Sequence, residues 1–197
     1  MSADGTGKGP ALMVSYGHSW VDGDGAFSRT SCFAALVARG LGLTLDNRAV
    51  GGSGSSAAAE LITSNPPPAA ELYVVMTGLN DLRLYGDDPT ALTRYFAALQ
   101  QIFATLRRTS PQSVVITVAQ PYLVDFSLFP PHDRGSNELI DRYNVALRRA
   151  AAEDPRVVLA EADDWDPHRM LADDTVHPND AGHACLARAA ARKTIGL

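Results

Sequence analysis

Serine, histidine, aspartate and asparagine occur in this sequence where acyl-transfer chemistry would need them. Ser19 follows a short apolar run that ends at Gly17, and a hydroxyl there becomes a strong nucleophile once a base removes its proton. His177 is the candidate base, because Asp174, three residues earlier, can accept from one ring nitrogen and leave the other free for Ser19. These side chains predict nucleophilic attack on a carbonyl carbon.

The tetrahedral intermediate of such a reaction needs hydrogen-bond donors for its oxyanion. One candidate is the side-chain amide of Asn80, in the sequence GLND at 78–81. The others are the backbone N–H groups of Ser19 and of one glycine in the pair Gly51-Gly52. Each pattern is weak alone, and the catalytic interpretation rests on all of them following successive strands in order.

Five short apolar runs rich in Val and Ile predict parallel strands that are buried on both faces. They cover residues 11–17, 43–50, 71–78, 113–120 and 156–162. Helical patterns lie between and after them, at residues 28–39, 89–109, 136–153 and about 180–194. Gly40 is predicted to follow the end of the first helix, and Ser136 and Asn179 or Asp180 are predicted to cap the last two.

This alternation predicts one α/β domain, with helices on both faces of a five-stranded parallel sheet in the order 2-1-3-4-5. The domain is expected to cover residues 11–197, after a flexible leader at residues 1–10. In open sheets of this kind, sites form beyond the carboxyl ends of the strands. The candidate residues named above all fall there.

Composition excludes several classes of protein. The net charge of −5 over 197 residues provides no basic stripe for nucleic acid. No apolar run approaches the roughly 20 residues needed to span a bilayer, and the start lacks a secretory pattern, so a cytoplasmic protein is expected. The Arg- and Ala-rich composition suggests a bacterial source. No Cys/His spacing predicts a metal site, and VDGDG at 21–25 lacks the closing Glu of a calcium loop, so it is interpreted as plain loop.

Taken together, the sequence resembles the SGNH hydrolases, the GDSL-type esterase and lipase superfamily, over nearly its whole length. The resemblance implies a three-layer, flavodoxin-like α/β/α fold, a Ser-His-Asp mechanism and no metal or organic cofactor. Four sequence blocks carry it: GHS with Ser19 as nucleophile, NRAVGG with Gly52 as oxyanion donor, GLND with Asn80, and DTVHP with Asp174 and His177.

The sequence departs from the family at His18, where the residue before the nucleophile is usually acidic. That position is not a triad member, so the departure bears on substrate or local structure. We expect His18, Trp20, Phe126 and Phe129 to contact the substrate. The apolar, Pro-rich segment 121–135 either covers the acyl site as a lid or packs as a plain connection.

The sequence therefore predicts a serine ester hydrolase for a small or medium acyl ester, of carboxylesterase, O-acetylesterase or thioesterase type, acting through an acyl-enzyme on Ser19. One alternative is an acyltransferase that uses the same acyl-enzyme, and another is a catalytically silent binding module that kept the fold. The substrate is expected to be a small molecule. Oligomeric state is left open by the sequence.

Overall fold

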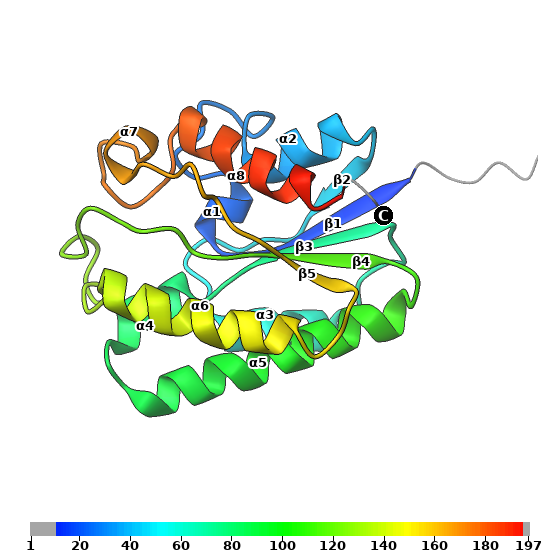
Figure 1. Ribbon diagram of the computed structural model, residues 1–197, viewed down its shortest axis with the longest axis horizontal. Helices are drawn as coiled ribbons and strands as arrows, with labels where there is room; N and C mark the ends of the chain where they lie inside the picture. The colour runs from blue at the N-terminus through cyan, green and yellow to red at the C-terminus, as the bar shows by residue number, and fades with distance from the viewer. Residues whose placement is uncertain (1–10, 195–197) are drawn as a thin grey trace, which may run out of the picture.

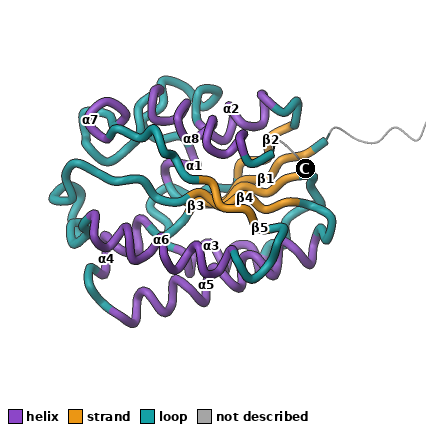
Figure 2. The backbone as a smooth tube through the Cα atoms, viewed as in Figure 1, coloured by secondary structure: helices purple, strands orange, loops and turns teal. Residues whose placement is uncertain are grey.

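A computed structural model describes residues 11–194. Five strands form one parallel sheet in the order β2-β1-β3-β4-β5, which confirms the predicted order (Figures 1 and 2). The strands are short and are, in chain order, β1 (Leu12–Gly17), β2 (Thr44–Asn47), β3 (Leu72–Met76), β4 (Val114–Val118) and β5 (Val157–Ala160). The three central ones are almost wholly buried, as strands covered on both faces must be.

Helices cover both faces of the sheet and make three layers (Figure 1). One layer contains α1 (Ser19–Asp22), α2 (Phe33–Gly40), α7 (Pro167–Met170) and α8 (Asp180–Arg192). The other contains α3 (Ser55–Ser64), α4 (Leu79–Tyr85), α5 (Pro89–Thr109) and α6 (Asn137–Ala151). This confirms the three-layer α/β/α architecture, and it places the loops after β1, β3 and β5 at one edge of the sheet.

Local sequence signals explain most helix ends. The α5 helix has the predicted bounds, with Asp88 accepting from the N–H of Thr90 at its start. Ser136 caps α6, and the Asn179 side chain caps α8 by accepting from two backbone N–H groups. The hydroxyl and carboxamide oxygens thus satisfy N–H groups that have no partner inside the helix.

One helix prediction needs correction. The first helix begins at Phe33 rather than at residue 28, because Ser28 and Ser31 hydrogen-bond each other in a separate turn. Gly40 is its last residue, and Gly42, with φ of +67°, takes the left-handed position that ends the helix. The α3 helix was not predicted, because its sequence begins with serines that also suit a loop.

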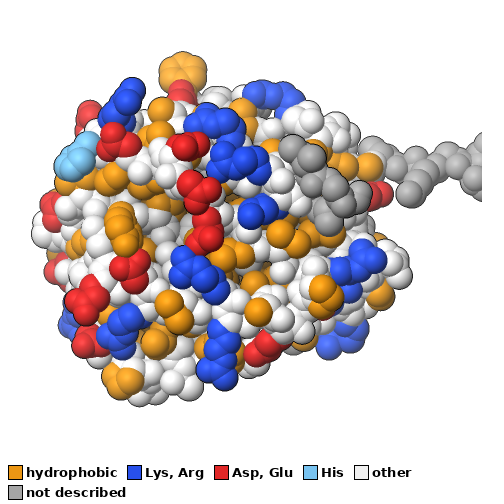
Figure 3. Space-filling view, in the orientation of Figure 1, with side chains coloured by type: hydrophobic (Ala, Val, Ile, Leu, Met, Phe, Trp, Pro, Cys, Tyr) orange, Lys and Arg blue, Asp and Glu red, His pale blue; other side chains and the backbone are white. Residues whose placement is uncertain are grey.

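Charged side chains of both signs lie close together on the face of the molecule shown in Figure 3. The protein has several exposed ion pairs, such as Arg148 with Glu161 at 2.5 Å, and pairs of this kind contribute little to stability. Within residues 11–194, no helix combines the length and apolar character that a membrane span requires.

Candidate active site

The turn between β1 and α1 holds Ser19 at the carboxyl edge of the sheet. Gly17 ends β1 beside Met76 of β3, and a Cβ atom on Gly17 would lie 2.0 Å from the Met76 carbonyl oxygen. Only glycine therefore fits where the two strand ends come this close. Ser19 is the first residue of α1, so its backbone N–H has no acceptor within that helix.

A continuous hydrogen-bonded chain joins Ser19 to His177 and Asp174. The His177 Nε2 atom lies 3.1 Å from the Ser19 hydroxyl oxygen, and its Nδ1 atom lies 2.6 Å from Asp174 Oδ2. Asp174 Oδ1 also accepts from the backbone N–H groups of Val176 and His177. Burial opposes ionisation of Asp174, but these hydrogen bonds outweigh it and hold the pKa of the carboxyl below its usual value.

The loop that carries Asp174 and His177 is fixed on both sides. Leu171 and Pro178 form an antiparallel bridge, and the His177 carbonyl accepts from the N–H of Ala172 at 2.7 Å. The loop also packs closely against Gly25, where a Cβ atom would lie 2.3 Å from the Pro178 carbonyl oxygen. A larger residue at this glycine would push His177 away from Ser19.

Asn80 occupies the first turn of α4, where its side-chain nitrogen donates to the Ser53 carbonyl oxygen at 3.0 Å. The neighbouring Asp81 is buried and accepts from the backbone N–H and the hydroxyl of Ser55, both at 2.8 Å. These contacts fix the turn that contains Gly52 against the start of α4. The Asn80 amide keeps a second N–H that can donate to an oxyanion.

These side chains surround a cavity of about 200 Å³. Its lining residues come from five separate loops or helix starts, and are Ser19, Asp24, Gly52, Leu79, Asn80, Arg83, Phe129, His132, Val176 and His177. The structure thus brings together every residue that the sequence assigned to the triad and the oxyanion site. It places Gly52, and not Gly51, in the cavity wall.

Arg83, His132 and Asp24 were not singled out in the sequence. Arg83 follows Asn80 by three residues on one helix, so it lies on the same face, and this spacing is a signal that could have found it. Its side chain is 3% exposed, and burial lowers the pKa of the guanidinium against the opposing effect of Asp174. His132 lies in the irregular segment after β4, where no periodicity indicates which side chains face inward.

The segment 121–135 is a covering loop that is tied down at several points. Arg83 donates to the Leu128 carbonyl oxygen at 2.6 Å, and the Arg83 carbonyl accepts from the N–H of Arg134. Phe129 lies over the cavity, half exposed, with its ring centroid 6.0 Å from that of His177. Its φ of +63° is unusual for a bulky residue, and such strain is typical of functional sites.

Phe126 does not line the cavity, which corrects the expectation that it contacts the substrate there. Its ring packs over Gly135, where a Cβ atom would lie 2.4 Å from Phe126 Cδ1. The ring therefore packs within the covering loop itself. Of the two phenylalanines proposed for substrate contact, the cavity includes only Phe129.

His18 and Trp20 are also corrected, because both are 0% exposed. His18 caps α1, and its Nδ1 atom accepts from the N–H of Trp20 at 3.3 Å. Trp20 stacks on Trp165 with ring centroids 5.5 Å apart. Neither side chain is accessible to a ligand, because both are buried between the end of β1 and the loop after β5.

Burial also decides the protonation of His18. Desolvation, followed by the repulsion from His177, lowers the pKa of His18 to about 3 and outweighs the opposing effect of the Gln120 side chain. His18 is therefore neutral near pH 7. Because Nδ1 already accepts from the backbone, His18 has no free basic nitrogen directed at Ser19, and His177 is the base that the geometry supports.

We expect His18 to make the folded protein sensitive to acid. The unfolded chain protonates this histidine near pH 6.5, whereas the folded chain does so only near pH 3. The free energy of unfolding should therefore fall as the pH drops through this window, by up to about 1.4 kcal/mol per unit. His18→Asn, which keeps an acceptor for the Trp20 N–H, should flatten that slope in urea unfolding between pH 6.5 and 4. The exposed His168 offers the control His168→Asn, and an unchanged slope in His18→Asn would contradict this assignment.

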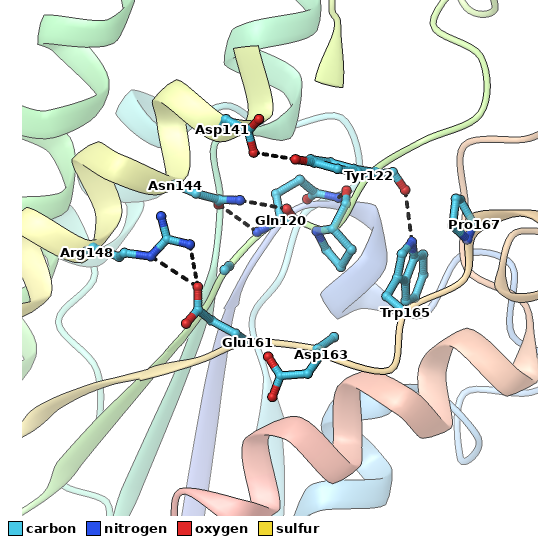
Figure 4. Close-up of a pocket in the computed structure, with 12 residues that line it drawn as sticks. Gln120, Tyr122, Asp141, Asn144, Arg148, Glu161, Asp163, Trp165 and Pro167 are labelled. Atoms are coloured by element: carbon cyan, nitrogen blue, oxygen red, sulfur yellow. Dashed lines mark hydrogen bonds and ion pairs between the residues drawn. The ribbon is translucent and has the colours of Figure 1, made fainter. Parts of the chain in front are cut away.

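A second depression, of about 250 Å³, lies beyond the ends of β4 and β5 (Figure 4). None of the triad residues lines it. Its polar side chains bond one another: Tyr122 donates to Asp141 at 2.7 Å, and the Trp165 indole donates to the Tyr122 carbonyl at 2.9 Å (Figure 4). These bonds tie the lining of the depression together, and none of its lining residues belongs to the hydrogen-bonded chain at Ser19.

Known structures share this architecture. A carbohydrate esterase family 2 enzyme with a carbohydrate-binding domain, from Corynascus thermopiles (Myceliophthora fergusii), is 19% identical with a TM-score of 0.72 over 93% of this chain and 65% of that chain. The salicylyl-acyltransferase SsfX3 from a tetracycline biosynthetic pathway is 22% identical, with a TM-score of 0.70 over 94% of this chain and 54% of that one. The chain thus spans less than two thirds of the length of either protein.

A third similar structure is the acetylxylan esterase Axe2 from Geobacillus stearothermophilus, which is 20% identical with a TM-score of 0.69 over 96% of this chain and 95% of that chain. At these identities the likeness shows the fold. No curated protein matches the sequence. The family profile of the GDSL-like lipases and acylhydrolases matches residues 15–185, a stretch that contains all the triad and oxyanion candidates. The chain therefore belongs to the GDSL-like lipase/acylhydrolase family.

Proposed function

We propose that this protein hydrolyses small or medium acyl esters through an acyl-enzyme on Ser19. The observation that carries the proposal is the chain from Asp174 through His177 to the Ser19 hydroxyl, with distances of 2.6 and 3.1 Å. Asp174 accepts from Nδ1–H and so fixes the tautomer that leaves Nε2 unprotonated. Nε2 then takes the proton as the Ser19 oxygen attacks the ester carbonyl.

The negative charge that forms on the carbonyl oxygen is held by donors in the cavity wall. The backbone N–H groups of Ser19 and Gly52 and the side-chain amide of Asn80 supply these donors. The protonated His177 gives its proton to the alcohol oxygen, the alcohol leaves, and an acyl group stays on Ser19. Water attacks this acyl-enzyme with His177 again as base, which releases the acid and restores the hydroxyl.

Cavity size and exposure support hydrolysis of compact acyl groups. A volume of about 200 Å³ suits a small acyl group better than a long chain. Acyl transfer to an alcohol would use the same acyl-enzyme and would require water to be kept away from it. Half of the Asp24 side chain and half of Phe129 are exposed at the mouth of the cavity, so water can enter, and we favour hydrolysis over transfer.

A fluorophosphonate probe tests the nucleophile directly. We expect one covalent phosphonate, placed on Ser19 by peptide mass spectrometry, because only a serine activated by a base reacts at a useful rate. Ser19→Ala should abolish labelling, whereas the control Ser28→Ala, in a hydrogen-bonded surface turn, should label as the wild type does. Labelling of another serine, or none in folded wild-type protein, would refute the proposal and would favour a silent binding module.

A further inference from the structure

Asp24 is held in a fixed place beside the catalytic residues. It lies in the loop after α1, where its backbone N–H donates to the Ser19 carbonyl oxygen at 2.9 Å. Its own carbonyl oxygen accepts from the Nε2 atom of His183 at 3.1 Å, and the His183 ring is fully buried. Both bonds hold the backbone of Asp24, so the fold sets the direction in which its Cα–Cβ bond leaves the loop.

The Asp24 carboxylate lies in the wall of the cavity at Ser19. Its Oδ2 atom lies 3.9 Å from Nε2 of His177, the nitrogen that exchanges the proton with Ser19. No residue between 11 and 194 donates a hydrogen bond to this carboxylate. Asp22, two residues earlier, differs in this respect, since it pairs with Arg29 at 2.9 Å outside the cavity.

The position beside Nε2 is where the alcohol part of an ester must sit. For His177 to protonate the departing alcohol oxygen, that oxygen has to come within hydrogen-bond distance of Nε2. A group on the carbon next to that oxygen is then brought toward the Asp24 carboxylate. A carboxylate is a hydrogen-bond acceptor only, so the group that it recognises must be a donor.

Charge selects the kind of donor. His177 carries a positive charge while it holds the proton that it passes to the alcohol, and its Nε2 atom is the one 3.9 Å from Asp24. This charge opposes an ammonium group beside Asp24 during the reaction, whereas a neutral hydroxyl meets no such repulsion. Resting on the proposed function, we infer that Asp24 binds the leaving group, and that the substrates are esters of polyols with a free hydroxyl beside the acylated oxygen.

Two acetate esters that differ by one donor test this inference. Ethylene glycol monoacetate carries the neighbouring hydroxyl, and 2-methoxyethyl acetate replaces that hydroxyl with an ether that can only accept. We expect the wild type to favour the hydroxyl ester by about tenfold or more in kcat/KM, because hydrogen bonds to charged groups are among the stronger ones. In Asp24→Ala this ratio should fall to near one, while the matched control Asp22→Ala should keep it.

The ratio of the two kcat/KM values separates recognition of the alcohol part from a general loss of activity. A misplaced His177 would slow the cleavage of both esters alike. Equal kcat/KM values for the two esters in a wild-type enzyme that labels at Ser19 would overturn the inference and leave the proposed function intact. So would an Asp24→Ala variant that loses activity equally on both esters, because Asp24 would then act on His177 rather than on the alcohol. If neither ester is cleaved and Ser19 takes up no phosphonate, the proposed function is itself wrong.

Discussion

Replacing His177 with alanine should lower kcat for a short-chain p-nitrophenyl ester by about 10⁴-fold or more. Without the imidazole, the Ser19 hydroxyl 3.1 Å away has no base to remove its proton, and the departing alcohol has no acid. Ser19→Ala should lose a similar factor. The double variant should lose little more than either single one, because the two residues act as a unit. Steady-state kinetics on all three proteins gives the comparison.

The control for this experiment is His168→Ala, which removes an exposed histidine from α7 and should leave kcat unchanged. Circular dichroism of each variant shows whether the fold is kept. If folded His177→Ala stays within tenfold of the wild type while His18→Asn loses activity, the two histidines have the opposite roles and the assignment of the base is wrong. Independent losses that multiply in the double variant would likewise contradict a shared proton-transfer unit.

Asn80→Ala should lower kcat by about 10²–10³-fold with a smaller change in KM. The amide already donates one N–H to the Ser53 carbonyl, so its remaining N–H is fixed in place before the oxyanion forms. Such a preorganised donor binds the transition state more tightly than the ground state. Asn80→Asp, which keeps the shape but removes the donor, should lose at least as much as the alanine variant.

The kinetics of Asn80→Ala must be compared with its stability, because Asn80 also holds the turn that contains Gly52. Thermal unfolding of Asn80→Ala measures the loss of that support. Gln120→Ala, which changes another buried amide outside the cavity at Ser19, provides a variant of similar chemistry for comparison. An effect confined to KM would mean that Asn80 binds the substrate and does not stabilise the oxyanion.

The arrangement of strands was predictable because burial leaves a clear pattern in short segments. Val and Ile runs such as 113–120 permit little except a strand covered on both faces, and chirality then leaves few orders for five of them. The α5 helix was equally clear, since its apolar residues repeat with the helical period over 21 residues. Parallel strands also end at one edge, so the distant Ser19 and His177 could be expected to meet.

The direction of individual side chains in loops was not predictable in the same way. His18 and Trp20 flank Ser19 in sequence, yet both side chains are buried, while Ser19 between them lines the cavity. Asp24 and His132 face the cavity for reasons that lie elsewhere in the chain, such as the contact between Asp24 and the buried His183. Long-range contacts of this kind leave no periodicity in the sequence.

The stack of Trp20 on Trp165 has a practical consequence, because these are the only two tryptophans in the chain. Tryptophan fluorescence therefore comes from one junction, between the turn that holds Ser19 and the segment that leads to Asp174 and His177. Any step that moves these two parts of the site relative to each other should change the emission. Rapid-mixing fluorescence can then follow acylation and deacylation in the unlabelled wild-type protein.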